Sequence, residues 1–202
     1  MASARSDAVA DAAITVLADQ GVRGLTHRAV DVAAGLSIGS TSNQARTRAA
    51  LLKLALVRLA AVEADEYTLP SRHPTADTDT SARSSAENLI DVVTHGLVVS
   101  LTTGRRTTLA RFELALEATR RPELRQLYSD LGRTFQLVMV DLLAQAGSRA
   151  PAADAHMLMS ACEGVLFYRL VGSGSAQVAV PDEIRSRVRG LVHMLVPESS
   201  TT

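Results

Sequence analysis

Apolar residues recur every three or four positions along most of this 202-residue chain. Close to the N-terminus, the repeat consists of Val9, Ala12, Ala13, Val16 and Leu17. This spacing places side chains on one face of an α-helix, so it predicts helices, whereas alternating strand patterns are nearly absent. The predicted fold class is all-α, with about nine helices in total.

The most distinctive part of the pattern is residues 21–52, where a tight turn separates two short helical patterns. Thr26 is a suitable N-cap for the first of these helices. Gly35 makes the turn, and Ser37 can cap the second helix, over about residues 38–44. This is the layout of a helix-turn-helix, in which the second helix enters the DNA major groove.

Longer helical patterns follow the helix-turn-helix. One runs from about residue 47 to 66, and the polar stretch 68–82, which contains two prolines, then predicts a loop. We expect a helix-turn-helix domain over residues 1–50 and a larger helical domain over residues 51–202. The larger domain has five further predicted helices, at about 83–102, 105–119, 122–142, 152–171 and 181–195.

The helix predicted at about 152–171 is apolar on two sides, so it is expected to be buried on both. Because a helix-turn-helix usually works on two half-sites, we expect this helix and the last one to form a dimer interface. The alternative is an ordinary helix of the chain's own core. The expected interface residues are Met157, Ala161, Gly164, Val165, Tyr168, Ile184, Val188, Leu191 and Leu195.

Composition and charge fit this organisation. Aromatic residues make up 3% of the chain and Trp is absent, so the core must be built from Ala, Val and Leu. The formal net charge is zero, but residues 1–58 hold seven basic and four acidic residues, against 14 and 17 in the remainder. A weakly basic head on an acidic body is the asymmetry expected of a DNA-binding domain joined to a domain with other partners.

The sequence favours a cytoplasmic protein. Cys162 is the single cysteine, which excludes an intramolecular disulfide framework and fits a reducing compartment. The N-terminus lacks the continuous apolar segment of a signal peptide. No stretch approaches the roughly 18 uncharged apolar residues of a membrane span.

Residues 5–52 resemble the N-terminal DNA-binding domain of TetR-family transcriptional regulators. The match covers about a quarter of the chain, and the remainder matches in size and helix content. The resemblance implies a homodimer that binds a roughly palindromic DNA operator, commonly as a repressor, with activation as the alternative. The matching elements are Val9, Ala12, Ala13 and Leu17, then Gly21-x-x-Gly24-Leu25-Thr26, Val30, Ala34-Gly35-Leu36-Ser37, Gly39 and Arg48-x-x-Leu51.

The chain departs from this family at the end of the second helix of the motif. Where the family usually has a Tyr, a Phe and a Lys, this chain has Ser42, Ala45 and Arg48. Each missing aromatic removes apolar packing of about 1.5–3 kcal/mol where it would be buried. Asp31 also stands where the family commonly has a small Ala.

Polar side chains on the second helix of the motif are the candidates for reading bases. Asn and Gln can each bond N6 and N7 of adenine, and short hydroxyl side chains also reach base edges. The alternative is that these side chains are solvated or touch phosphates only. The candidates for base contact are Ser40, Thr41, Asn43 and Gln44.

Phosphate contacts require basic side chains, hydroxyl groups or helix N-termini. Such residues cluster at the starts of two predicted helices, one on each side of the base-reading helix. The alternative for each Arg is a solvated surface charge. The candidates for phosphate contact are Thr26, His27, Arg28, Arg46, Thr47 and Arg48.

The family resemblance further implies a pocket for a small-molecule effector in residues 51–202, whose occupancy changes the spacing of the two DNA-binding domains. Polar residues on otherwise apolar helices are the candidates, and each is alternatively an ordinary core or surface residue. No cofactor or metal is expected. The candidates are His95, Arg111, Glu113, Tyr128, His156, Cys162 and Glu163.

Two other classes of function remain for comparison. An enzyme is disfavoured because the chain lacks a Glu-x-x-His pair, a Cys/His zinc pattern, a phosphate-binding glycine loop and G-x-S-x-G. Cys162 lies among apolar neighbours, where an inert thiol is expected rather than a nucleophile. A helical protein–protein adaptor without sequence-specific DNA binding is the other alternative, and the missing aromatics at Ser42 and Ala45 keep it open.

Overall fold

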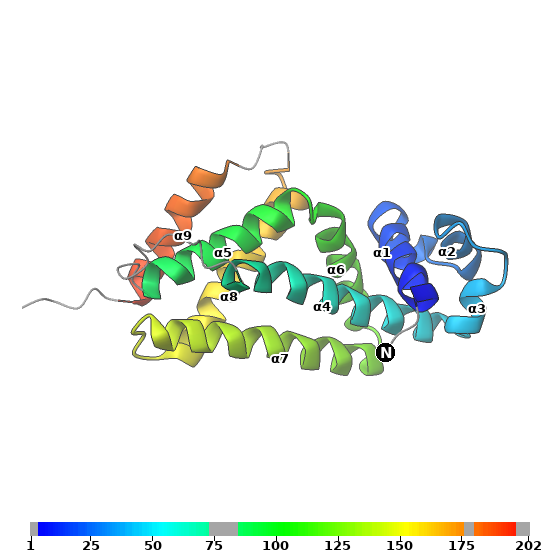
Figure 1. The fold of residues 1–202 in the computed structure, drawn as a ribbon, viewed down its shortest axis with the longest axis horizontal. Helices are drawn as coiled ribbons and strands as arrows, with labels where there is room; N and C mark the ends of the chain where they lie inside the picture. The colour runs from blue at the N-terminus through cyan, green and yellow to red at the C-terminus, as the bar shows by residue number, and fades with distance from the viewer. Residues whose placement is uncertain (1–3, 73–84, 176–179, 197–202) are drawn as a thin grey trace, which may run out of the picture. The chain divides into compact units, whose positions relative to one another are not determined.

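The computed structural model describes residues 4–72, 85–175 and 180–196, and these residues form nine α-helices and no β-strand. The predicted all-α class is therefore confirmed. In chain order the helices are α1 (Ala4–Gly24), α2 (His27–Ala33), α3 (Ser40–Gln44), α4 (Arg48–Arg72), α5 (Ser85–Leu101), α6 (Arg105–Ala118), α7 (Pro122–Gln145), α8 (Pro151–Leu170) and α9 (Pro181–Leu195) (Figure 1).

Helix α4 is longer than predicted. It continues through Pro70 to Arg72, so the expected loop at 68–82 is wrong for its first five residues. Proline lacks a backbone N–H and removes one helical hydrogen bond, which a 25-residue helix can lose near its end. The remainder of that expected loop, residues 73–82, lies outside the described residues.

The chain folds into two compact units. Unit 1 comprises Met1–Ala64 and Gly104–Gly132, and unit 2 comprises Asp65–Thr103 and Arg133–Thr202. Helices α4 and α7 therefore contribute residues to both units. The division of function between residues 1–50 and 51–202 stays a prediction.

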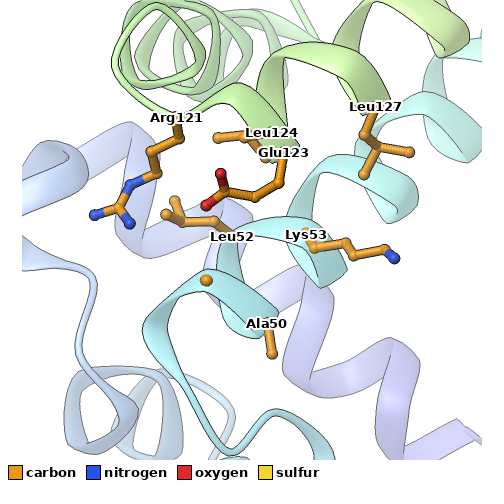
Figure 2. Close-up of a pocket in the computed structure, with 8 residues that line it drawn as sticks. Ala50, Leu52, Lys53, Arg121, Glu123, Leu124 and Leu127 are labelled. Atoms are coloured by element: carbon orange, nitrogen blue, oxygen red, sulfur yellow. The ribbon is translucent and has the colours of Figure 1, made fainter.

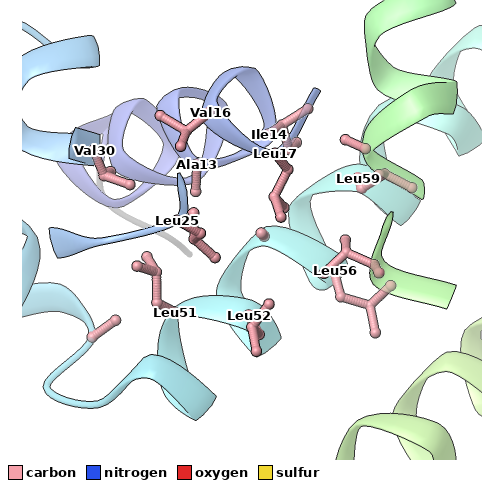
Figure 3. Close-up of a cluster of buried hydrophobic side chains, with 14 of the residues drawn as sticks. Ala13, Ile14, Val16, Leu17, Leu25, Val30, Leu51, Leu52, Leu56 and Leu59 are labelled. Atoms are coloured by element: carbon pink, nitrogen blue, oxygen red, sulfur yellow. The ribbon is translucent and has the colours of Figure 1, made fainter. Parts of the chain in front are cut away.

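The core of unit 1 is built from aliphatic side chains, and it joins the helix-turn-helix to α4 and α6 (Figure 3). Leu17, Leu25 and Leu51 are fully buried, and Leu114 of α6 is buried with them. Burial of each large apolar side chain contributes about 1.5–3 kcal/mol. The helix-turn-helix therefore packs on a helix that lies much later in the sequence.

A polar contact also joins α1 to α6. Gly21 interrupts α1 with a φ of 67°, in the left-handed region that favours glycine. The N–H of the next residue, Val22, donates to Oε2 of Glu113 at 2.9 Å. The interruption leaves this N–H without a helical partner, and the α6 carboxylate supplies one.

Helices α5, α8 and α9 form the core of unit 2. Ile90 of α5, Leu158 of α8 and Val188 of α9 are all buried. At the edge of this core, Arg185 of α9 forms an ion pair with Glu87 of α5, with Nη2 and Oε2 2.8 Å apart. The last helix is thus held against α5 by apolar packing and by charge.

Candidate DNA-binding surface

Helix α2 begins as the sequence predicts. Oγ1 of Thr26 accepts a hydrogen bond from the Ala29 N–H at 3.1 Å, which makes Thr26 the N-cap. The side chains of Thr26 and Arg28 are exposed. Both therefore remain candidates for phosphate contact.

Helix α3 begins two residues later than predicted. Gly39, with a φ of 93°, precedes its first turn, and Ser37 does not cap it. Instead, the hydroxyl oxygens of Ser37 and Ser40 are 3.1 Å apart. The guanidinium of Arg5 in α1 also donates to the Ser40 hydroxyl oxygen, at 3.0 Å.

The later start changes which side chains of α3 face the solvent. Ser40 is 3% exposed and Thr41 is 0% exposed, so the prediction that these two residues contact bases is wrong. Asn43 and Gln44 are exposed, which a base contact requires, and both remain candidates. Ser42 is exposed as well. Sequence reasoning missed Ser42 because it treated the position only as the place of a missing aromatic residue.

Asp31 of α2 is buried, with 1% of its surface exposed, and its carboxylate meets the start of α3. Oδ2 accepts from the Gly39 N–H and Oδ1 from the Thr41 N–H, each at 2.7 Å. The Thr41 hydroxyl, the two backbone N–H groups and the charge of His27 hold the pKa of Asp31 below its ordinary value, against the burial that raises it.

The role of Asp31 was missed in the sequence, although a signal exists. A buried carboxylate requires hydrogen-bond donors, and the start of a helix offers N–H groups without helical partners. An acidic residue on the inward side of α2, shortly before a Gly-marked helix start, fits that requirement.

His27 makes the corresponding contact at the other end of α3. Its Nε2 lies 2.6 Å from the backbone carbonyl oxygen of Ala45, the residue that follows α3. The ring is half-buried, and Nε2 donates to this carbonyl. The predicted phosphate contact of His27 therefore competes with a contact inside unit 1.

Arg48 is engaged inside unit 1. Its guanidinium donates to the backbone carbonyls of Val22 and Leu25, so a phosphate contact of Arg48, which stays a prediction, would compete with these bonds. The Val22 carbonyl also accepts from the Leu25 N–H at 3.2 Å, so the half-buried arginine adds a second donor there and a donor for the Leu25 carbonyl. Arg46 and Thr47 are exposed and remain candidates.

The exposed apolar surface of unit 2 differs from the predicted dimer interface. Ile184 and Val188 are 3% and 1% exposed, so they belong to the chain's own core and cannot line an interface. The periodicity of α9 was correct, but α5 covers the stripe. Of the other candidates, Met157, Gly164 and Tyr168 are exposed, while Ala161, Val165, Leu191 and Leu195 are half-buried. Phe167, Val171 and Met194, which were not predicted, are exposed.

The candidate effector residues are divided between the units. Arg111, Glu113 and Tyr128 belong to unit 1, whereas His95, His156, Cys162 and Glu163 belong to unit 2. The Arg111 Nε is 3.0 Å from Oε1 of Glu63, and Glu113 binds the α1 backbone. Arg111 and Glu113 therefore have partners within unit 1, and their predicted part in effector binding stays a prediction.

Two hollows can be compared with these candidates. One, of about 260 Å³ in unit 1, lies between the start of α4 and the α6–α7 corner (Figure 2). Its lining includes none of the predicted effector residues; it consists of Ala49, Ala50, Leu52, Lys53, Arg121, Glu123, Leu124 and Leu127. The second, of about 30 Å³ in unit 2, is lined in part by Cys162 and Arg169.

Cys162 is the predicted effector residue that lines a hollow. Burial raises the pKa of its thiol to about 12, and the negative charge of Glu163 adds to this effect. A thiol with this pKa stays protonated at neutral pH and is a poor nucleophile. Its environment is therefore that of a packing residue or an apolar ligand contact.

No helix among the described residues is long and apolar enough to cross a membrane. Within the same residues, no group of three or more His, Cys, Asp or Glu side chains is placed to hold a metal ion.

The described residues form an all-helical fold that begins with a helix-turn-helix, which places the chain in the class of helix-turn-helix proteins. Residues 84–198 match the family described as "Tetracyclin repressor-like, C-terminal domain". Because this match covers more than half of the chain, the chain belongs to the TetR family of transcriptional regulators. The resemblance seen at the N-terminus is thereby confirmed by the other end of the chain.

Solved structures share the whole fold. A transcriptional regulator from Rhodococcus sp. Rha1 is 19% identical, with a TM-score of 0.78 over 98% of both chains. A member of the TetR family from Streptomyces coelicolor A3 is 25% identical, with a TM-score of 0.69 over 96% of this chain and 99% of that one. The multidrug binding protein EbrR, complexed with ethidium, is 25% identical, with a TM-score of 0.64 over 95% and 99%. A comparison with curated proteins finds no match.

The lowered pKa of Asp31 predicts a pH-dependent contribution to stability. The contribution is present above the unfolded-state pKa of about 3.9 and is lost as the pH falls through the lower folded-state pKa. At pH 7, Asp31→Asn should lower the free energy of unfolding by about 2–3 kcal/mol, because a charged acceptor of two N–H groups is lost. Urea unfolding of both proteins should show this difference shrinking below about pH 4. A difference that stays constant from pH 7 to pH 3 would contradict the assignment.

Proposed function

We propose that this TetR-family regulator is a homodimeric, effector-responsive repressor that binds a roughly palindromic DNA operator. The observation that carries the proposal is that three consecutive polar residues of α3, the second helix of the helix-turn-helix, are exposed: Ser42, Asn43 and Gln44. These side chains offer amide and hydroxyl groups of the kind that read base edges. The exposed Arg28 and Arg46 supply charge for the DNA backbone.

Dimerisation is supported by the exposed apolar residues of α8 and α9. Met157, Phe167, Tyr168 and Val171 lie on α8 or at its end, and Met194 lies on α9. Because α8 and α9 pack on each other, we propose that these side chains belong to one apolar surface, of the kind that marks a protein–protein interface. In a two-fold dimer, the two α3 helices would occupy half-sites about 34–36 Å apart, or a multiple of that distance.

Effector control is supported by the family and by a relative. EbrR binds ethidium in its solved structure, and we carry over only the idea of a small-molecule effector bound by the C-terminal part of the chain. An effector shifts the protein between two states only by its differential affinity for them. The expected cytoplasmic location stays a prediction.

The central test is the selection of bound duplexes from a random DNA pool by the full-length protein. We expect enrichment of a palindromic motif, because two identical α3 helices read two related half-sites. Binding that depends on salt but enriches no motif would instead support the protein–protein adaptor. Sedimentation of the protein with the selected duplex should give two chains for each duplex.

Two neighbouring arginines should behave differently. Arg46→Ala should lower the slope of log affinity against log salt concentration by about one unit, because one phosphate contact is lost. Arg48→Ala should leave that slope unchanged and lower the free energy of unfolding by about 1–3 kcal/mol, because the Leu25 carbonyl loses the arginine donor and the Val22 carbonyl keeps only the Leu25 N–H. Anisotropy titrations at several salt concentrations and urea unfolding separate the two effects. The reverse pattern would contradict the assignment.

Gln44→Ala should relax the base preference at one operator position. The loss on the preferred duplex should be about 1–3 kcal/mol, the discrimination expected of one bidentate base contact. Competition between duplexes that differ at single positions measures this loss. The control is Gln126→Ala, an exposed glutamine on α7. Unchanged affinity and selectivity would remove Gln44 from the base-reading set.

A further inference from the structure

Helix α3, which carries the exposed candidates for base contact, is too short to be stable or to fix its own orientation. Helix α3 has five residues, and its N-cap, Gly39, offers no side chain to its first N–H groups. Helices this short are unstable alone in water, because nucleation fixes several residues for one hydrogen bond. The orientation of α3 must therefore be set by groups outside it.

Besides Arg5 of α1, which contacts the Ser40 hydroxyl, two such groups lie on α2 and contact both ends of α3. Asp31 accepts the Gly39 and Thr41 N–H groups at the start, and His27 contacts the Ala45 carbonyl oxygen at the end. Residues four apart in a helix lie on the same face, so one face of α2 presents both side chains to α3. We call Asp31 and His27 the α3 clamp.

The two carboxylate oxygens of Asp31 restrict the orientation of α3 as well as its distance from α2. Each oxygen binds a different N–H group at 2.7 Å, and the two groups are two residues apart. A bidentate contact of this kind restricts both the position and the rotation of the first turn. Because Asp31 is 1% exposed, water cannot easily replace it.

We propose that the α3 clamp, and Asp31 above all, is the positioning element for sequence-specific DNA recognition by this protein. Asp31 does not touch the DNA; it holds Ser42, Asn43 and Gln44 in the orientation that reads bases. The inference rests on the proposed function. The family usually has aromatic residues where this chain has Ser42 and Ala45, so those side chains cannot anchor α3 here. The proposal assigns the anchoring of α3 to Asp31 and His27 instead.

The proposal separates two kinds of DNA contact. Base contacts require side chains to be held within about 0.5 Å and 10–20° of their productive geometry. Phosphate contacts by the long, exposed side chains of Arg28 and Arg46 tolerate a small rotation of α3. Loss of the clamp should therefore reduce affinity for the operator far more than affinity for unrelated DNA.

The test compares the full-length wild type with Asp31→Asn and Asp7→Asn. Asparagine keeps the shape of Asp31 but turns an NH2 group toward a backbone N–H, and Asp7→Asn removes the same charge from α1 in the same unit. Each protein is titrated with the selected duplex and with a scrambled duplex of the same length and composition, at several salt concentrations. Circular dichroism at the assay temperature checks that each is folded.

We expect Asp31→Asn to lose about 10-fold to 100-fold in affinity for the selected duplex, the discrimination carried by about one base contact. Its affinity for the scrambled duplex and its salt slope should change by less than about twofold, because the phosphate contacts remain. Asp7→Asn should keep the wild-type ratio of the two affinities. A merely structural role for Asp31 would scale both affinities by the folded fraction and leave their ratio unchanged.

The other end of the clamp provides an independent pair of variants, which decides the matter if Asp31→Asn does not fold. His27→Gln keeps an N–H donor for the Ala45 carbonyl, whereas His27→Ala removes it. We expect His27→Ala to lower the ratio of specific to non-specific affinity and His27→Gln to restore it. Equal ratios in the two variants would overturn the proposal.

The outcomes also separate this inference from the proposed function. If the wild type prefers a motif and Asp31→Asn keeps the wild-type ratio, the clamp is overturned and the proposed function stands. If the wild type shows no preference for any duplex, the proposed function fails and the clamp fails with it.

Discussion

The buried carboxylate of Asp31 at the start of α3 is the interaction on which the candidate DNA-binding surface depends. A buried charge must be matched by donors, and a helix start leaves N–H groups in need of acceptors. In this chain the Asp31 carboxylate accepts from the N–H groups of Gly39 and Thr41, so both needs are met by the same two hydrogen bonds. The five-residue α3 is thereby tied to α2, and its outer side chains are exposed at defined positions.

The same dependence on distant groups extends through unit 1. The interruption of α1 at Gly21 leaves backbone groups that Glu113 of α6 and Arg48 of α4 satisfy. Leu114 of α6 packs into the core beneath them. A helix-turn-helix built this way depends on α6 for both its core and its backbone hydrogen bonds. Any displacement of α6 would alter the Glu113 hydrogen bond and the Leu114 packing at the end of α1.

Sequence patterns predicted the helices well because burial of an apolar stripe is a local, periodic signal. The predicted start of α3 was two residues too early, because Gly39 rather than Ser37 precedes its first turn. As a result, Ser40 and Thr41 were predicted to be exposed, although both are buried. Periodicity also cannot say what covers a stripe. Ile184 and Val188 fit a dimer interface and an internal core equally well, and only the packing of α9 on α5 decides between them.

The position of Asp31 also explains how the two kinds of candidate contact divide between elements. The start of a helix is ordinarily a good place for a phosphate, because its N–H groups point outward. At α3 the carboxylate already occupies the first of these groups, so a second anion there would meet a like charge. The candidates for phosphate contact that remain exposed are then Arg28, Arg46 and Thr47 at the start of α4. Helix α3 is left to present amide and hydroxyl groups, which suits base reading better than anchoring to the DNA backbone.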